Sequence, residues 1–484
     1  MQGGLPLSVY GIVVALYLSL KLVGYCRYRP FEQAITTPPV SVIIATYNED
    51  PALMRACLDS ILDQPYPVAE VFITDDGSED KRAWRAINQY AARDSRIVAH
   101  RFPENRGKRH AQAYGFARAT GDLFVTVDSD SILEPNALAE LVKPFADQGV
   151  TAVTGYPKIL DRERTLLSRL IDMRYWSSFN VDRGAQSVLG ITTCCTGVFS
   201  AYRADIVREV LTAYVEQKFL GKPCHYGDDR HLTAHALKRG KVVFQSTAQA
   251  WTAAPDGFPT YVRQQTRWMR SFWRESLLAL AWAPKRSIVL AALMVVELSL
   301  PLALLGVGVG TMLYRVFVLG ALASLGMYLL AIAVMAYLRN LAYSRRHLGT
   351  FLIAPLYGVL FFTVHLPLLL YALVTLRTTH WGTRQVTTAD AGRPALIGRI
   401  GFSLGLGNLL RQDRANAVLL PVRGAQLHRL QQRIHRRATA DSAPTAESGT
   451  PREEPTATRH RVVPPDTSLA VQRFRGVAAE ADDG

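Results

Sequence analysis

The stretch Leu123–Asp130, with the sequence LFVTVDSD, decides the fold expected for this chain. Its first five residues are apolar or β-branched, which is typical of a strand buried inside a sheet. Two carboxylates, Asp128 and Asp130, follow it directly. Such a pair can hold a hard divalent cation that also binds a diphosphate, although turns of this kind also cap helices or bind calcium. The stretch therefore predicts a strand that ends in a candidate metal and diphosphate site.

Three similar strands precede this stretch. Between Val40 and about Phe145, short apolar runs at Ser41–Ala45, Val71–Thr74 and Ile97–His100 alternate with amphipathic stretches of helical period. Strands that alternate with helices in this way are typical of a parallel α/β sheet. Ligands of such sheets bind beyond the carboxyl ends of the strands, so we expect the functional site at that edge.

Polar side chains gather at the predicted carboxyl ends. Thr46–Glu49 follows the first strand and Asp75–Ser78 follows the second. Asp76 is suited to accept a hydrogen bond from a nucleobase or ribose, but an ordinary Asp-Gly turn has the same sequence. Lys108, which follows the turn at Gly107, suits a phosphate or a donor carboxylate, and equally suits a solvated helix start.

Two further polar signatures lie downstream, just before a long apolar tract. Tyr226–Thr233 contains the adjacent carboxylates Asp228 and Asp229, and Gln264–Trp268 follows it. A carboxylate can accept the proton of a hydroxyl, an arginine suits phosphate, and a tryptophan face suits a sugar ring. This order predicts polymer synthesis at a membrane.

Apolar runs indicate the membrane segments. The run Leu5–Val23 has basic residues only on its C-terminal side, which predicts an anchor whose C-terminal end faces the cytoplasm. Ile288–Gly310, Val316–Leu338 and Phe351–Leu376 are each long enough to span a bilayer. Basic residues flank the last tract on both sides, so we expect a re-entrant or interfacial hairpin. Glu297 is expected to face a polymer-conducting lumen, with a bond to a neighbouring helix as the alternative.

Composition narrows the function further. Of the 484 residues 49% are hydrophobic, and the formal net charge is +15. The basic residues crowd beside the apolar tracts, which favours membrane flanks and sugar phosphates over nucleic acid. Five cysteines without metal-ligand spacing favour a reduced, cytosolic domain. His231 and His235 lie four residues apart on an expected helix, but no third ligand is evident, so packing or capping is favoured over metal binding.

The motifs occur together in an order that is highly specific. They are Ser41–Asp50, Asp75–Ser78, Val127–Asp130, Tyr175-Trp176, Cys194–Gly197 with Tyr202-Arg203, Gly227–Thr233, Gln264–Trp268 and Trp381–Arg384. With them the chain resembles the processive, inverting family 2 glycosyltransferases, over about residues 39–384. It most resembles the hyaluronan synthases and the chitin-oligosaccharide synthases of nodulation, to which the cellulose synthases are related.

The resemblance implies a role for each acidic motif. Asp76 would help to seat the uridine, and Asp229 would be the general base. Asp128 and Asp130 would frame Mg²⁺ or Mn²⁺. Inversion needs one carboxylate to deprotonate the acceptor hydroxyl, which attacks the anomeric carbon opposite the departing UDP.

The resemblance also implies substrate-binding positions. Arg267 would contact the leaving diphosphate and Trp268 would stack under the acceptor sugar, while Trp381 and Arg384 would belong to a loop that closes over the nucleotide. Cys194 matches a cysteine near the nucleotide in hyaluronan synthases, although a small buried thiol without chemistry is the alternative. The remaining positions expected to bind substrate are Tyr47, Glu49, Lys108, Asp128, Asp228, Arg230 and Gln264.

The expected fold is a GT-A type α/β nucleotide-sugar-binding domain inserted between transmembrane helices, with interfacial helices. The composition of the last residues, rich in Ala, Thr, Pro, Glu and Arg, adds a disordered C-terminal tail. The expected segments are an N-terminal transmembrane helix at 5–26, a cytoplasmic glycosyltransferase domain at 38–270, an interfacial helix at 271–286, two transmembrane helices at 287–340, a re-entrant or transmembrane segment at 350–377, a gating loop at 378–392 and a largely disordered cytoplasmic tail at 393–484.

We therefore expect a multi-pass plasma-membrane polysaccharide synthase. It would transfer sugars from UDP-GlcNAc and UDP-GlcA with inversion, and would extrude a growing beta-linked polymer of hyaluronan type through the lipid bilayer. The alternative is an N-acetylglucosaminyltransferase that makes chitin-like oligomers, or a synthase of another UDP-sugar-derived exopolysaccharide. The pair Cys194-Cys195 favours the chitin-oligosaccharide branch, whereas Gly227-Asp228-Asp229 favours hyaluronan.

Two other expectations concern partners and class. No apolar hairpin follows Thr387, so a homo-oligomer or another partner could complete a channel. A noncatalytic membrane protein that binds or exports carbohydrate is the reading from a different class. That reading has to explain why every expected acidic position is filled.

Overall fold

The structure is a computed structural model that describes residues 5–33, 37–255 and 257–378. All of these residues belong to one unit, Met1–Ala438, and a second unit, Thr439–Gly484, lies outside the described residues. The expected tail at 393–484 and all but the first residue of the expected loop at 378–392 also lie outside them.

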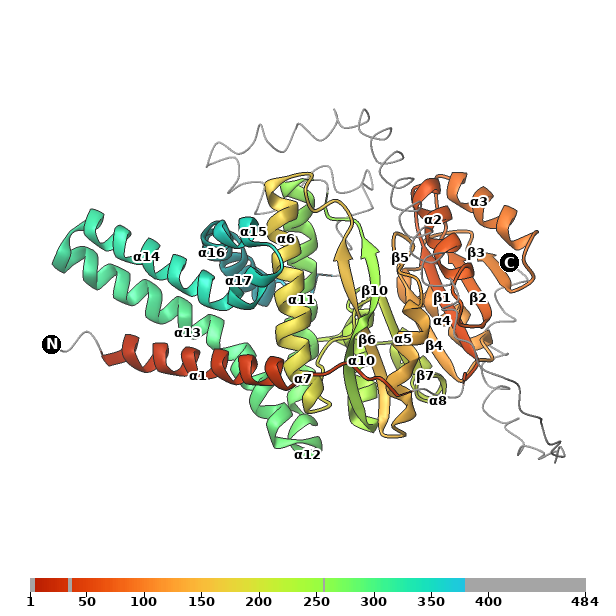
Figure 1. The fold of residues 1–484 in the computed structure, drawn as a ribbon, viewed down its shortest axis with the longest axis horizontal. Helices are drawn as coiled ribbons and strands as arrows, with labels where there is room; N and C mark the ends of the chain where they lie inside the picture. The colour runs from red at the N-terminus through yellow and green to blue at the C-terminus, as the bar shows by residue number, and fades with distance from the viewer. Residues whose placement is uncertain (1–4, 34–36, 256, 379–484) are drawn as a thin grey trace, which may run out of the picture. The chain divides into compact units, whose positions relative to one another are not determined.

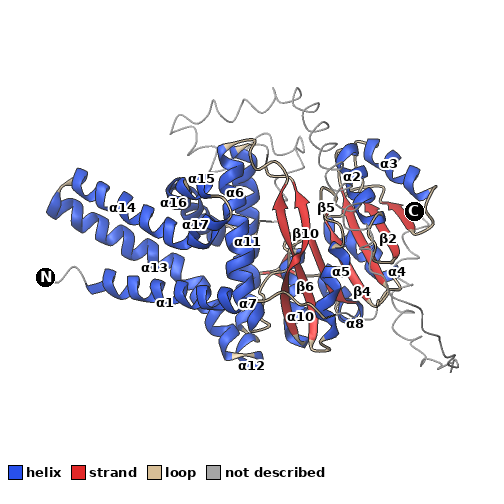
Figure 2. Cartoon of the chain, in the orientation of Figure 1, coloured by secondary structure: helices blue, strands red, loops and turns tan. Residues whose placement is uncertain are grey.

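A mixed sheet of eight strands forms the centre of the larger domain (Figures 1 and 2). Its strands are β1 (Val40–Thr46), β2 (Val68–Asp75), β3 (Ile97–Arg101), β4 (Leu123–Val127), β5 (Ile132–Leu133), β6 (Val150–Ile159), β7 (Phe199–Arg203) and β10 (Lys241–Thr252). Their order is β3-β2-β1-β4-β7-β6-β10-β5. The four strands β1 to β4 are mutually parallel, whereas β7 is antiparallel to both β4 and β6. A separate small hairpin joins β8 (Lys218–Phe219) to β9 (Lys222–Pro223).

Helices cover both faces of this sheet. They are α2 (Pro51–Leu62), α3 (Arg82–Ala91), α4 (Lys108–Arg118), α5 (Ala137–Val142), α6 (Leu166–Trp176), α7 (Gly184–Val188), α8 (Ala204–Glu209), α9 (Leu211–Val215) and α10 (Asp228–Arg239), with the 3₁₀ turn η1 (Lys143–Ala146) and the π-helical η2 (Ser177–Arg183). In β1, Val42 and Ile44 pack against α2, α3 and α5, while Ile43 packs against α4 and α8 to α10. Because a central strand is buried on both faces, its sequence is almost wholly apolar.

Three helices begin at the carboxyl edge of the sheet, and the local sequence fixes each start. Asp50 caps α2 by accepting hydrogen bonds from the backbone N–H groups of Ala52 and Leu53. Gly107 and Gly227 precede α4 and α10 with φ angles of 97° and 81°, a conformation that glycine adopts without strain. These starts direct the first turns of α4 and α10 toward the same edge.

The apolar segments form a second group of helices. They are α1 (Leu5–Arg27), α11 (Phe258–Leu280), α12 (Ala283–Arg286), α13 (Ile288–Leu319), α14 (Ala321–Asn340), η3 (Leu341–Arg345), α15 (Leu348–Leu352), α16 (Ala354–Leu360), the π-helical η4 (Phe361–His365) and α17 (Leu366–Val374). The stretches Ile288–Val318, Leu322–Arg345 and Ala354–Val374 are long and apolar enough to cross a membrane. Figure 1 shows α1, α13 and α14 running side by side away from the sheet.

One carboxylate joins two of these helices to the sheet domain. Asp182 in η2 lies 3.0 Å from Nζ of Lys21 in α1 and 2.9 Å from a guanidinium nitrogen of Arg339 in α14. The two cations hold the pKa of Asp182 below its ordinary value although its burial acts in the opposite direction. The carboxylate is therefore ionised and compensates two positive charges.

The fold class predicted from the sequence is confirmed, with corrections in detail. The four predicted strands are β1 to β4, but the antiparallel β7 and the long strands β6 and β10 were not predicted, so the sheet is mixed rather than parallel. The boundary expected between residues 270 and 271 falls inside the continuous helix α11. The segment at 350–377 consists of short helices. Pro355 lies at the start of α16, and Pro367 lies at the start of α17, directly after the π-helical η4. A proline has no N–H to donate, so each one interrupts the regular helical hydrogen-bond pattern.

Candidate active site

One cavity of about 750 Å³ brings most of the predicted site residues together. It opens at the carboxyl edge of the sheet and continues between α11 and α13. The predicted residues that line it are Glu49, Lys108, Asp128, Asp130, Cys194, Asp228, Asp229, Arg230, Gln264, Arg267 and Trp268. Tyr47 and Asp76 are not among its lining residues, and Trp381 and Arg384 lie outside the described part of the chain.

Lys108 connects two acidic motifs that are far apart in sequence. Its Nζ lies 2.6 Å from Oδ1 of Asp128 and 3.2 Å from Oδ2 of Asp228. Burial alone would lower the pKa of Lys108, but the two carboxylates outweigh it and raise that pKa above its ordinary value. Burial likewise opposes ionisation of Asp228, yet Lys108 and Arg109 lower its pKa. The lysine is therefore a half-buried cation held between two carboxylates, not a solvated helix start.

Asp229 has the environment of a general base. Its Oδ1 accepts a hydrogen bond from the backbone N–H of Arg230 at 2.7 Å, and Sγ of Cys194 lies 3.9 Å from its Oδ2. Burial and the neighbouring carboxylate of Asp228 raise the pKa of Asp229 above its ordinary value. A raised pKa makes a carboxylate a better acceptor for the proton of a hydroxyl. Adjacent carboxylates thus differ: one is paired with lysine and the other is made more basic.

The turn that carries these carboxylates is docked on α11. A Cβ on Gly227 would clash with Oγ of Ser271 and would lie 2.7 Å from Nη2 of Arg274. The carbonyl of Tyr226 accepts hydrogen bonds from Arg274 and, at 3.3 Å, from Arg109. Glycine is required here by its positive φ and by the close approach of α11.

Asp128 and Asp130 fit a divalent cation. Both line the cavity, and Gly197 leaves room beside them, since a Cβ there would lie 3.2 Å from Oδ2 of Asp128 and 3.2 Å from Nζ of Lys108. Carboxylate oxygens are the ligands that Mg²⁺ and Mn²⁺ prefer. No group of three or more His, Cys, Asp or Glu side chains suited to a metal occurs in the described ranges. A cation held by this pair would have coordination positions left for a diphosphate and water.

Another part of the cavity wall is aromatic and includes α13, a helix long and apolar enough to cross a membrane. The indole of Trp268 is 36% exposed and its ring centroid lies 6.2 Å from that of Tyr175. Glu297 in α13 also lines the cavity, and its Oε1 accepts hydrogen bonds from the Tyr17 hydroxyl at 3.4 Å and the Gln186 amide at 3.2 Å. Glu297 thus faces a cavity and is hydrogen-bonded to residues of neighbouring helices, whereas its expected place in a polymer-conducting lumen stays a prediction.

Glu49 and Asp76 hold loops at the carboxyl edge. Glu49 accepts a hydrogen bond from the Ser129 hydroxyl at 2.6 Å. Asp76 accepts hydrogen bonds from the backbone N–H groups of Arg106 at 2.8 Å and Gly107 at 2.9 Å. Burial of Asp76 raises its pKa to about 6. Asp76 therefore shapes the start of α4 as well as offering a carboxylate at the end of β2.

His231 and His235 are packed residues in this structure. Their Nε2 atoms lie 3.3 Å apart, and Nδ1 of His231 lies 3.2 Å from Oε2 of Glu275. Glu275 also accepts from the Gln217 amide at 2.9 Å. This buried chain of polar groups joins α10 to α11, which agrees with a packing role.

Several cavity residues had no role assigned from the sequence. They are Arg174, Asp182, Arg183, Gln186 and Tyr226. Four of them lie on α6, η2 and α7, where Tyr175-Trp176 was the only motif nearby. No spacing in the sequence indicates that these helices turn toward Asp229.

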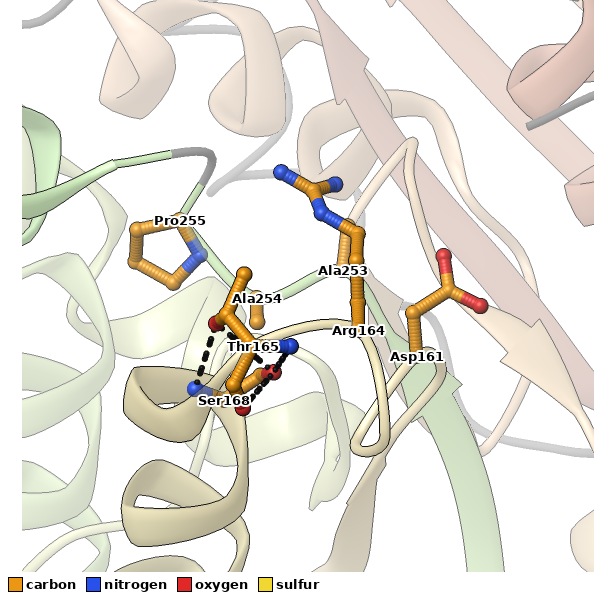
Figure 3. Close-up of a pocket in the computed structure, with 7 residues that line it drawn as sticks. All are labelled: Asp161, Arg164, Thr165, Ser168, Ala253, Ala254 and Pro255. Atoms are coloured by element: carbon orange, nitrogen blue, oxygen red, sulfur yellow. Dashed lines mark hydrogen bonds between the residues drawn. The ribbon is translucent and has the colours of Figure 1, made fainter. Parts of the chain in front are cut away.

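A second cavity, shown in Figure 3, holds about 10 Å³ beside the start of α6. Thr165 and Ser168 cap this helix through reciprocal hydrogen bonds of 3.0 and 2.8 Å. The space admits about one water molecule, so it cannot take a sugar. The lining residues are Asp161, Arg164, Thr165, Ser168, Ala253, Ala254 and Pro255.

Comparisons with known proteins show the family of the chain. The model of the family described as "Glycosyl transferase family 2" matches residues 41–211. The hyaluronan synthase of Streptococcus pyogenes is 39% identical over 390 residues, which cover 80% of this chain and 93% of that protein. An N-acetylglucosaminyltransferase of Rhizobium sp. (strain N33) is 36% identical over 361 residues, covering 72% of this chain and 78% of that protein.

A solved structure gives the same fold. The mannosyltransferase of Pyrobaculum calidifontis, solved in complex with GDP-Man and Mn²⁺, has a TM-score of 0.51 at 22% identity, and the match covers 72% of this chain and 97% of that chain. Fold and site therefore define a glycosyltransferase of GT-A type. The chain belongs to glycosyltransferase family 2, in which hyaluronan synthases are its relatives over most of its length. The predicted family, fold class and polysaccharide-synthase activity are thereby confirmed.

Proposed function

We propose that this protein builds a hyaluronan-type polymer from UDP-GlcNAc and UDP-GlcA and moves it across the plasma membrane. The observation that carries this proposal is the single cavity that joins Asp128 and Asp229 to Glu297 and Pro301 of α13. Groups suited to glycosyl transfer and the wall of a membrane helix thus share one space. A polymer that grows at one end of this space can leave through the other.

In this proposal Asp229 is the general base. Its carboxylate takes the proton of the acceptor hydroxyl, whose oxygen attacks the anomeric carbon as the bond to UDP breaks on the opposite face. An alpha-linked donor then gives a beta-linked product, and no covalent intermediate between sugar and enzyme is needed. Lys108 keeps Asp128 and Asp228 in place by its short ion pairs to both.

Asp128 and Asp130 are the residues that would hold Mg²⁺ or Mn²⁺. When bound, the cation neutralises charge on the diphosphate of the donor and of the leaving UDP. Arg267 lines the same cavity and carries a guanidinium group suited to phosphate oxygens. Asp76 at the end of β2 is the proposed acceptor for the uridine.

The aromatic end of the cavity suits the acceptor sugar. Trp268 offers an exposed face, and Tyr175 lies beside it. Sugar rings stack on such faces through their apolar C–H surface. Gln264, one turn earlier on α11, offers an amide to the acceptor hydroxyls.

We place the catalytic domain in the cytoplasm and residues 350–377 in a re-entrant segment. Its start and its end both contact residues of the expected catalytic domain at 38–270, because Arg162 donates to Oγ1 of Thr350 at 3.2 Å and Arg270, at the boundary of that domain in α11, donates to Oγ1 of Thr375 at 3.0 Å. A segment that leaves one domain and returns to it does not change sides. This supports a cytoplasmic position for Trp381 and Arg384, where UDP-sugars are available.

Purified enzyme supplied with UDP-GlcNAc alone, UDP-GlcA alone or both tests the proposed product. We expect polymer only with both donors, and a hyaluronan-specific lyase should degrade it. Polymer or oligomers made from UDP-GlcNAc alone would instead identify the alternative, an N-acetylglucosaminyltransferase. That alternative is supported by the rhizobial relative and by the pair Cys194-Cys195.

A further inference from the structure

The side chain of Tyr226 lies between the catalytic turn and the end of the last apolar segment. Tyr226 directly precedes Gly227-Asp228-Asp229 and is only 2% exposed. Its hydroxyl donates a hydrogen bond of 2.8 Å to the carbonyl of Thr378, 152 residues away. The residue next to the catalytic carboxylates is therefore bonded to the chain that follows α17.

Two further hydrogen bonds hold the same segment on α11. Nε1 of Trp273 donates to the carbonyl of Leu369 at 3.0 Å, and Nε of Arg270 donates to Oγ1 of Thr375 at 3.0 Å. Arg270 also lies over the ring of Tyr371, 5.4 Å from its centroid. The first half of α11 carries Gln264, Arg267 and Trp268. The helix α11, which carries the residues proposed for the acceptor site, thus also forms hydrogen bonds to α17 and to Thr375 directly after it.

The hydroxyl of Tyr226 is not needed to fold the turn itself. The carbonyl of Tyr226 is fixed by Arg274 and Arg109, and the Arg274 guanidinium lies 5.0 Å from the centre of the tyrosine ring. These contacts involve the backbone and the ring. The hydroxyl is the part of the side chain that reaches the end of α17, through the carbonyl of Thr378 and through Arg270, which also holds Thr375.

We propose that the Tyr226 hydroxyl is a positioning group for sugar transfer, which holds the end of α17 against the turn that carries Asp229. Its proton is engaged by Thr378, so it acts through that residue and not as a proton donor to the substrate. Small displacements of a reacting group lower the rate strongly. The inference rests on the proposed glycosyl transfer and adds a residue that the transfer step depends on.

The variant Tyr226→Phe tests this role because it keeps the ring and removes only the hydroxyl. We expect kcat for UDP release to fall about 3- to 10-fold, the size expected for one lost hydrogen bond, with the KM for each donor within about twofold of the original. The matched control is Tyr337→Phe. The Tyr337 hydroxyl donates to the carbonyl of Leu352 at 2.9 Å, a similar bond at the other end of the same segment, and neither residue lines the cavity. This control should keep the original kcat.

A second variant tests whether Tyr226 acts through the contact between the end of α17 and α11. Thr375→Val removes the acceptor of the Arg270 bond and should also lower kcat. The double variant should lose less than the product of the two single effects, since both act on one contact. Three outcomes would each overturn the proposal. The first is a kcat of Tyr226→Phe equal to that of the original enzyme. The others are equal losses of kcat in Tyr226→Phe and Tyr337→Phe, or a raised KM with an unchanged kcat in Tyr226→Phe.

The readouts keep this inference separate from the proposed product. UDP release by variant and original enzyme reports the transfer step whatever polymer is made. Digestion of the polymer made by the original enzyme reports product identity. A product other than hyaluronan would therefore refute the proposed function and leave the result for Tyr226 valid.

Discussion

At the residue scale, the site depends on a difference between two adjacent carboxylates. Asp228 is buried and pairs with Lys108, while the half-buried Asp229 has a raised pKa because of desolvation and the neighbouring carboxylate of Asp228. We predict that Asp229→Asn lowers glycosyl transfer by about 10²- to 10⁴-fold, the usual contribution of a general base. UDP binding, measured by calorimetry, should persist because the amide is isosteric. Normal turnover by this variant would remove Asp229 from its proposed role.

Asp76 predicts a pH dependence of donor binding. Its pKa is raised to about 6 by burial, so the carboxylate becomes protonated as the pH falls through that value. Protonation removes the hydrogen-bond acceptor that the Asp76 carboxylate offers to uridine. The KM for UDP-sugars should therefore rise below about pH 6, and the rise should approach tenfold per pH unit. Steady-state kinetics between pH 5 and about pH 8 would measure it.

The variant Asp76→Asn provides the control for this pH profile. An amide at position 76 does not titrate, so the KM should be higher overall and should lose its rise at low pH. If the variant and the original enzyme show the same rise below about pH 6, another group is responsible and Asp76 does not seat the uridine.

Most of the candidate site could be predicted because few other residue types can perform the chemistry of its side chains. Carboxylates after a buried strand, a lysine at a helix start and a tryptophan before an apolar tract each carry a local signal. Tyr226 and Asp182 carry none, because their partners Thr378 and Arg339 lie 152 and 157 residues away in sequence. Such pairs arise only when the chain has folded.

At the scale of the elements, β1 to β4 were predicted because each contains a short apolar run. β6 and β10 have polar residues such as Thr154, Gln245 and Thr247 among their apolar ones, so no such run marks them, and nothing in a run states whether its neighbour is parallel or antiparallel. The direction of β7 follows from its pairing with both β4 and β6, which is a tertiary property. The parallel half of the sheet was therefore predicted and the mixed half was not.

The segment from α15 to α17 permits a prediction about membrane sides. If both of its ends contact the catalytic domain, a cysteine at position 378 should resist an impermeant thiol reagent in intact cells and react after permeabilisation. A cysteine at Phe317, which is 93% exposed near the turn between α13 and α14, should react from outside.

Labelling of these two positions needs a background without competing thiols. Cys26 is the exposed cysteine among the described residues, so Cys26→Ser provides that background. Ready labelling of position 378 in intact cells would refute the re-entrant segment and would put Trp381 and Arg384 on the outer side. Failure to label position 317 from outside would refute the orientation of α13 and α14.

At the scale of the whole molecule, Asp182 links the catalytic domain to the helices that we assign to the membrane. Its partners Lys21 and Arg339 come from opposite ends of the described chain and meet on one turn of η2. Asp182 also lines the cavity. Loss of one member of a buried ion pair leaves the other charge uncompensated, which destabilises far more than loss of an exposed pair. Replacement of Asp182 should therefore lower the stability of the protein more than replacement of a charged residue on the surface.

We predict that Asp182→Asn destabilises the protein by about 3 kcal/mol, because two cations lose their shared partner. The apparent melting temperature of the detergent-solubilised enzyme should fall by about 5 to 10 °C. Lys241→Gln is the matched control, since it breaks an ion pair of 2.8 Å to Asp147 whose side chains are 54% and 40% exposed. That change should cost less than about 1 kcal/mol. Similar melting shifts in the two variants would show that the Asp182 contacts are no stronger than a surface pair.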